Sequence, residues 1–148
     1  MLEEPTLTVS PWFEARRRNY YDALFNVSST GAWDSYVSFF AKGIREAADS
    51  TKRQMLALVA VQESLKEKIR DSALRSGTAH ALVDLAVGSA SFTVPQAQRH
   101  LGVSYNRANR LVSELVDLGI LSERGQKTYK RRFYAPEVLD VFVSRSEQ

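Results

Sequence analysis

The chain has 148 residues, a formal net charge of +3, an apolar share of 44% and no cysteine. These values are typical of a soluble globular protein with one or two small domains, and they exclude disulfide bridges and thiolate zinc sites. No stretch approaches the roughly 18 consecutive apolar residues of a membrane-spanning helix, and the N-terminus lacks the features of a signal peptide. We therefore expect a cytoplasmic protein with no membrane partner.

Residues 1–75 are predicted to form a helical region. Ser10 and Pro11 are typical of a helix start, because serine can cap the free N–H groups and proline fits the first turn. The first helix should therefore run over residues 12–27 and stop at the turn formers of residues 28–31.

Residues 32–75 are predicted to contain two more helices. The first has the spacing of one buried stripe, and Gly43 either kinks the chain or is tolerated. The second covers residues 44–75 and carries a heptad seam, which needs a partner helix. That partner is either the first two helices or a second copy of the chain, and the sequence does not separate the two. The stripe is Trp33, Tyr36, Val37 and Phe40, and the seam is Ile44, Ala48, Thr51, Met55, Leu58, Gln62, Leu65 and Ile69.

A domain boundary is predicted at residues 75–78. Gly77 can end the long helix, and Thr78 can cap the next one. Residues 76–148 would then form a second domain, which begins with a short apolar helix over residues 79–87.

A helix-turn-helix pattern follows. Thr93 and Gln96 have the spacing of a capping box, with Pro95 in the first turn of a helix that Gly102 ends. Ser104 is then expected to cap a third helix over residues 105–118. A buried stripe is predicted on that helix at Ala108, Leu111, Val112, Leu115 and Leu118, and a polar face at Tyr105, Asn106, Arg107, Asn109, Arg110 and Ser113.

A β-hairpin should come directly after the third helix, as the wing does in a winged helix-turn-helix. The pattern predicts strands at residues 120–124 and 129–134 joined by a turn at residues 125–128, and a closing helix from Pro136 to Val143. Positive charge gathers here, since residues 99–132 carry 8 basic and 3 acidic side chains. The hairpin's basic residues are Arg124, Lys127, Lys130, Arg131 and Arg132.

The expected fold class is therefore mainly α, with a helical N-terminal region including a long helix, followed by a winged helix-turn-helix with a small β-hairpin. Arg107 and Arg110 are the candidates for base contacts in the major groove of DNA, and Lys127, Lys130 and Arg132 for backbone contacts. The full set of candidate DNA-binding residues is Tyr105, Asn106, Arg107, Asn109, Arg110, Arg124, Lys127, Lys130, Arg131 and Arg132.

The chain also resembles a known family over nearly its whole length. Residues 7–24 read Leu-Thr-Val-Ser-Pro-Trp-Phe-Glu-Ala-Arg-Arg-Arg-Asn-Tyr-Tyr-Asp-Ala-Leu. They resemble the stretch after the catalytic helix in Fic-family proteins, and residues 31–43 resemble the next segment. The winged helix, with Gly119-Ile-Leu and Tyr134-Ala-Pro-Glu-Val-Leu, resembles the C-terminal domain that often follows. Fic proteins typically transfer AMP from ATP to a hydroxyl of a target protein.

The resemblance implies a non-catalytic C-terminal part of a Fic protein. The family's His-Pro-Phe-x-x-Gly-Asn-Gly-Arg loop is absent, since neither His80 nor His100 is followed by Pro-Phe. We therefore expect no catalytic residue and no cofactor, and two isolated histidines make a poor metal site. The alternative to DNA binding is a protein-interaction or dimerisation module. It would contact the Fic catalytic domain or its target protein, or form a homodimer through the helix of residues 44–75.

Overall fold

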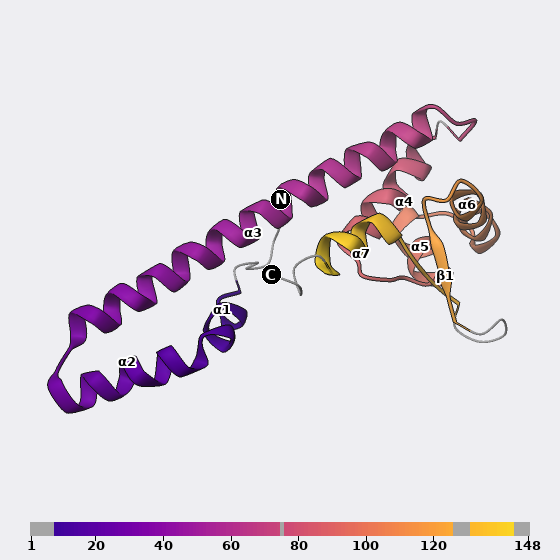
Figure 1. Cartoon of the computed structure of the whole chain (residues 1–148). Coiled ribbons are helices and arrows are strands. Elements are labelled where there is room, and N and C mark those ends of the chain that lie inside the picture. Colours follow the sequence, from indigo (N-terminus) through magenta and orange to yellow (C-terminus); the bar gives the residue numbers. More distant parts are fainter. Residues whose placement is uncertain (1–7, 75, 126–130, 144–148) are drawn as a thin grey trace. The chain divides into compact units, whose positions relative to one another are not determined.

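The computed structural model describes residues 8–74, 76–125 and 131–143, and it is mainly helical with one small antiparallel β-hairpin (Figure 1). The chain divides into two compact units, Met1–Met55 and Leu56–Gln148. This division lies 20 residues before the predicted boundary of 75/76, because the end of the long helix carries core side chains of the second unit. No helix in the described part of the chain combines the length and apolar character that a membrane span requires.

The first unit begins with α1 (Ser10–Ala15) and α2 (Arg17–Thr30), where one helix was predicted. The helix is interrupted at Arg16, whose backbone leaves the helical region with φ −119° and ψ 29°. Ser10 is not the cap: it lies inside α1, and the capping position belongs to Val9, which makes no side-chain hydrogen bond to the helix. The predicted stop after α2 is confirmed, because Gly31 adopts a φ of 69°.

The two helices predicted over residues 32–75 form a single helix, α3 (Trp33–Arg70), of which residues 33–55 belong to the first unit. Gly43 neither kinks nor ends it. The glycine is there for close approach, since a Cβ at Gly43 would lie 2.7 Å from the ring of Trp12. The ring of Trp12 in turn contacts Phe13 and Phe39, with centroids 5.0 and 5.1 Å away, so aromatic packing joins α1 to α3.

The stripe predicted as buried on α3 is largely exposed. The side chains of Trp33 and Val37 are 62% and 58% exposed. Phe39 and Gly43, a quarter turn away, meet the aromatic rings of α1, and within the stripe Phe40 stacks on Phe13 at 5.1 Å. The prediction was wrong because this part of the helix is apolar over more than one face, and spacing alone does not say which face is covered.

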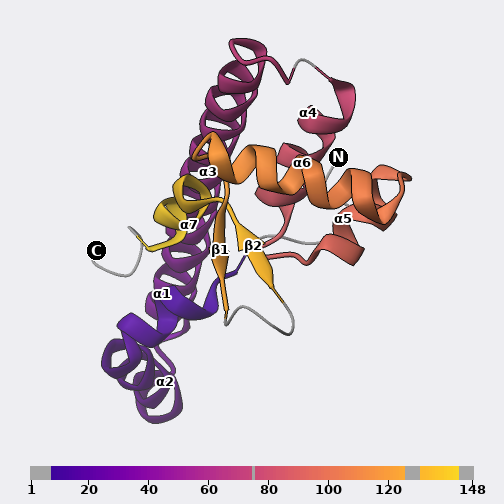
Figure 2. The same cartoon turned by 90° about the vertical axis from the view of Figure 1, so that its right-hand side faces the viewer.

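The second unit is a winged helix-turn-helix (Figure 2). It contains the end of α3, then α4 (Gly77–Gly88), α5 (Val94–Leu101), α6 (Tyr105–Asp117), β1 (Ser122–Arg124), β2 (Arg132–Tyr134) and α7 (Pro136–Val143). The two strands are antiparallel, with Glu123 opposite Phe133. Phe92 adds a bridge on the other side of β2, since its N–H and carbonyl both bond to Phe133, at 2.9 and 2.8 Å.

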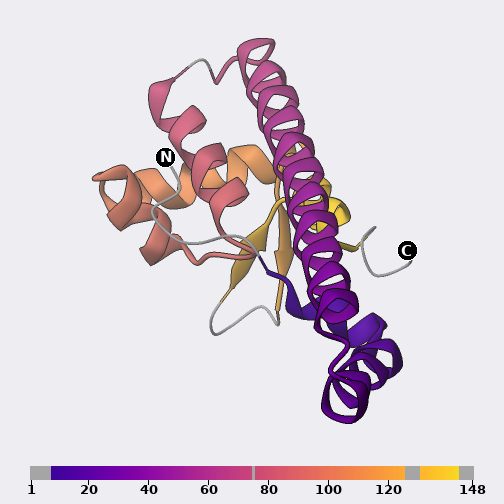
Figure 3. The ribbon, with the colours of Figure 1, turned by 90° about the vertical axis from the view of Figure 1, so that its left-hand side faces the viewer.

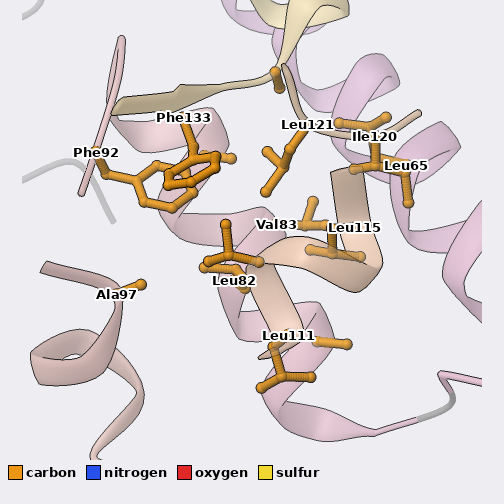
Figure 4. Close-up of a cluster of buried hydrophobic side chains, with 14 of the residues drawn as sticks. Leu65, Leu82, Val83, Phe92, Ala97, Leu111, Leu115, Ile120, Leu121 and Phe133 are labelled. Carbon is orange, nitrogen blue, oxygen red and sulfur yellow. The ribbon is translucent and has the colours of Figure 1, made fainter. Parts of the chain in front are cut away.

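Aliphatic and aromatic side chains from all of these helices and from β2 form one core in the second unit (Figure 4). Leu65 and Ile69, the last two members of the predicted seam, are fully buried in it, and α3 runs alongside α4 (Figure 3). These two seam positions are covered by the second unit itself, and a homodimer through the helix of residues 44–75 stays a prediction. The helix itself ends at Arg70 rather than Arg75.

Most of the predicted helix ends in this unit are confirmed. The capping box of Thr93 and Gln96 is present, and Gly102 adopts a φ of 63° after α5. Ser104 caps α6 by accepting from the N–H of Arg107. One cap differs from the prediction: Ser76, rather than Thr78, accepts from the N–H of Ala79 at the start of α4.

Candidate nucleic-acid interface

Helix α6 has one buried and one exposed face, as predicted. Four of its apolar residues are buried, and only Leu118, just beyond the helix end, departs from the predicted stripe with 42% exposure. The buried residues are Ala108, Leu111, Val112 and Leu115. On the opposite face Tyr105 is 50% exposed, and Arg107 and Arg110 are exposed as well. The guanidinium groups that the prediction assigned to base contacts are therefore accessible.

The two helices of the helix-turn-helix pack through small side chains. Ala97 of α5 and Ala108 of α6 are both fully buried, and they belong to the same core cluster. Small residues let two helices approach closely, which fixes the direction of α6 relative to α5. The polar face of α6 is thereby held on the outside of a rigid element. Of its remaining members, Asn106 is exposed, and Asn109 and Ser113 are half-buried.

Arg131 contacts two other residues of the wing. Its Nε and Nη2 atoms donate to the two carboxylate oxygens of Glu123 at 2.7 and 2.9 Å, and its guanidinium lies 5.2 Å from the centre of the Phe133 ring. The hydrogen bonds to Glu123 raise the pKa of Arg131, and the phenol of Tyr105 contributes to the same shift. Tyr105 is the first residue of α6.

Two arginines of the wing face each other across the strands. Arg124 of β1 is the direct partner of Arg132 of β2, and both side chains are exposed. Like charges at directly opposed positions destabilise a β-pair. The guanidinium of Arg132 is oriented by a hydrogen bond, because its Nε donates to Ser91 Oγ at 3.0 Å. The hairpin thus carries two exposed arginines at directly opposed positions, one of them oriented by Ser91.

The remaining candidates lie outside the described residues. Lys127 and Lys130 fall in the segment of residues 126–130, so the structure does not place them. The described candidates come together on one unit: α6 supplies five and the hairpin supplies Arg124, Arg131 and Arg132. Exposed arginines on α6 and on the hairpin of one unit are groups that can bind a polyanion.

Sequence reasoning missed two participants, Glu123 and Ser91. Glu123 could have been found from alternation on the hairpin, because a carboxylate on one strand usually meets a basic partner on the other. That inference needs the register, which depends on the turn length. Ser91 carries no local signal, since its contact with Arg132 joins residues 41 positions apart.

The described residues, 8–74, 76–125 and 131–143, contain no cluster of three histidine or carboxylate side chains that could ligate a metal beside these candidates. Comparison with models of known protein families and with curated proteins found no match for the chain. The resemblance to Fic proteins therefore stays a prediction.

Proposed function

We propose that the second unit binds double-stranded DNA, with α6 in the major groove and the wing on the phosphate backbone. The observation that carries this proposal is the pairing of Arg124 with Arg132, which sets two exposed arginines at directly opposed positions of the hairpin. A phosphate bound at this position would accept hydrogen bonds from both guanidinium groups.

The exposed start of α6 supports the same proposal. Arg107 and Arg110 lie one helical turn apart, so both can point into one groove from a single helix face. Arginine can bind the O6 and N7 atoms of guanine through two parallel hydrogen bonds. The weak ion pair of Arg110 with Glu114, at 3.7 Å and with 72% of the arginine side chain exposed, can break at little cost when DNA binds.

The wing is tested by the salt dependence of binding to a fluorescently labelled duplex, followed by anisotropy. The wild-type affinity should fall linearly with salt concentration on logarithmic axes, because each neutralised phosphate releases counterions. The double variant Arg124→Ala/Arg132→Ala should reduce that slope by about 2, since each phosphate contact contributes about 0.9. The variant Arg53→Ala/Arg70→Ala removes the same charge from exposed positions on α3 and should leave the slope unchanged.

The helix is tested by selection from a pool of randomised duplexes. The wild type should enrich a common sequence, and Arg107→Ala/Arg110→Ala should lose that enrichment while it keeps most of the salt slope, because these side chains read bases. A wild-type affinity that does not respond to salt, or an equal slope for the wing variant and its control, would overturn the proposal.

We also infer, from the resemblance of residues 7–43 alone, that this unit accompanies a Fic-type AMP-transferase domain. The test is the reading frame in which the chain is encoded. A His-Pro-Phe-x-x-Gly-Asn-Gly-Arg loop upstream would support the inference, and a frame without that loop would contradict it.

A further inference from the structure

The first unit leaves large apolar side chains exposed on α2 and α3, although the ring of Phe40 also stacks on Phe13. Among residues 8–55, only Gly43 and Ala47 are buried, and no large side chain is. Six large apolar or aromatic side chains are exposed instead, and the exposed fraction reaches 70% for Phe25. They are Tyr21 and Phe25 on α2 and Trp33, Val37, Phe40 and Ile44 on α3. Apolar surface gathered in this way is typical of an interaction site.

Four of these side chains form one stripe on α3. Trp33, Val37, Phe40 and Ile44 follow each other by four, three and four residues, which keeps them on one face of a helix. We call these four residues the α3 stripe. Two charged side chains flank it: Asp34 comes one residue after its first member, and Arg45 comes one residue after its last. Both are exposed.

We propose that the α3 stripe pairs with the α3 stripe of a second copy of this chain, with the two helices antiparallel about a two-fold axis. The spacing of the four residues, which is four, three and four, is the same when counted from either end of the stripe. An antiparallel pair therefore places Trp33 against Ile44 of the partner subunit. In the same register Val37 meets Phe40 of the partner subunit. The two-fold axis repeats each of these contacts, so every residue of the α3 stripe has a partner in the other copy.

The flanking charges select the second copy and the antiparallel direction. In this register Asp34 lies near Arg45 of the partner subunit, and the symmetry axis repeats the pair, so the interface has two opposite-charge contacts. A parallel pair would instead place the two Asp34 side chains on opposite sides of the helix pair and far from Arg45 of the partner subunit, so it would form no opposite-charge contact. The same surface therefore complements itself in one direction only.

The shape beside Phe40 agrees with this pairing. An open hollow of about 430 Å³ is lined in part by Phe13, Tyr20, Tyr21 and Phe40 of the first unit. The partner residue opposite Phe40 is a valine, which is small enough to enter a hollow between aromatic rings. Such insertion of one side chain between several is how paired helices pack.

The stripe is tested by the molar mass of the full chain, measured by light scattering after size-exclusion chromatography. The wild type should show twice the 16.7 kDa chain mass. Val37→Glu should weaken the dimer by more than about 100-fold, because it places a charge in an apolar contact. The matched control is Val59→Glu on the same helix: Val59 is 55% exposed, against 58% for Val37, but lies 22 residues farther along the chain. It should leave the mass unchanged.

The direction is tested by exchanging the flanking charges. Asp34→Arg and Arg45→Asp alone should each weaken the dimer about tenfold, because each creates two like-charge contacts. The double variant should recover wild-type affinity, since the pairs are restored with reversed sign. A wild-type monomer at all concentrations, equal effects of Val37→Glu and Val59→Glu, or no recovery in the double variant would each overturn the proposal. DNA binding by the second unit is measured separately, so the failure of one proposal does not imply the failure of the other.

Discussion

The two units of this chain use apolar residues in opposite ways. In the second unit the large aliphatic side chains of α3, α4, α6 and the wing meet in one core, and eleven of its large side chains are less than 2% exposed. In the first unit the contacts are ring against ring, from Trp12 and Phe13 to Phe39 and Phe40, at centroid distances between 5.0 and 6.0 Å.

One helix, α3, therefore has a different role in each unit. The end of α3 completes a core, whereas its start presents the α3 stripe to the outside. A small unit buries too little surface to be stable on its own unless something else covers it. We therefore expect the second unit to unfold cooperatively by itself, and the first to depend on its partner.

The largest effect should come from the core of the second unit. Leu115→Ala should lower the free energy of unfolding by about 2–5 kcal/mol, because it leaves a cavity in a fully packed region. Leu118→Ala, three residues later and 42% exposed, should cost less than about 1 kcal/mol. Urea unfolding followed by circular dichroism measures both.

The same experiment separates the units. The two tryptophans, Trp12 and Trp33, both lie in the first unit, so their fluorescence reports on that unit alone. Leu115→Ala should shift the dichroism transition and leave the fluorescence transition in place. Equal shifts of both signals would show that the two units unfold as one and would contradict the expectation that the second unit unfolds by itself.

A smaller effect is expected at the close approach of Trp12 to α3. Gly43→Ala gains about 1 kcal/mol of helix propensity, but its Cβ would meet the Trp12 ring at 2.7 Å. We expect the free energy of unfolding measured by tryptophan fluorescence to fall by about 1–2 kcal/mol, and the emission maximum to change. Gly88→Ala at the end of α4, where nothing lies within 4 Å, should be neutral or stabilising, and a loss there equal to that of Gly43→Ala would contradict the steric explanation.

The smallest expected effect is on how the free energy of unfolding depends on pH. Burial raises the pKa of Asp84 on α4, but hydrogen bonds from Lys66 and Gln62 of α3, at 2.7 and 2.6 Å, outweigh it and hold the pKa below its ordinary value of 3.8. The folded state therefore binds this proton more weakly than the unfolded state. The stabilisation is present above the unfolded pKa and is lost as pH falls through the folded pKa.

Asp84→Asn should remove this part of the acid dependence. The unfolding midpoint in urea, measured from pH 7 down to pH 3 by circular dichroism, should fall less steeply for the variant than for the wild type. Asp71→Asn, in the exposed turn after α3, is the control and should keep the wild-type dependence. Identical profiles for Asp84→Asn and the wild type would show that the contact of Asp84 with Lys66 and Gln62 does not contribute to the acid dependence of stability.

Local sequence was sufficient to predict the winged helix-turn-helix. The capping box of Thr93 and Gln96, the turn at Gly102 and the alternation of buried and exposed residues on α6 act over three to five residues, so they are visible without a structure. The exposure of Arg107 and Arg110 follows from the same periodicity. These features depend on hydrogen bonds and spacing within single elements.

The tertiary structure decided which apolar face is covered and which charges meet. Hydropathy marks Val37 and Leu65 alike, but only Leu65 has a core to enter, because the rest of the second unit surrounds it. The register that sets Arg124 opposite Arg132 depends on how the whole hairpin packs on Phe92, as does the contact from Ser91 to Arg132. Which of two apolar faces is covered, and which strand positions pair, depend on segments far apart in the chain, so a local pattern does not decide them.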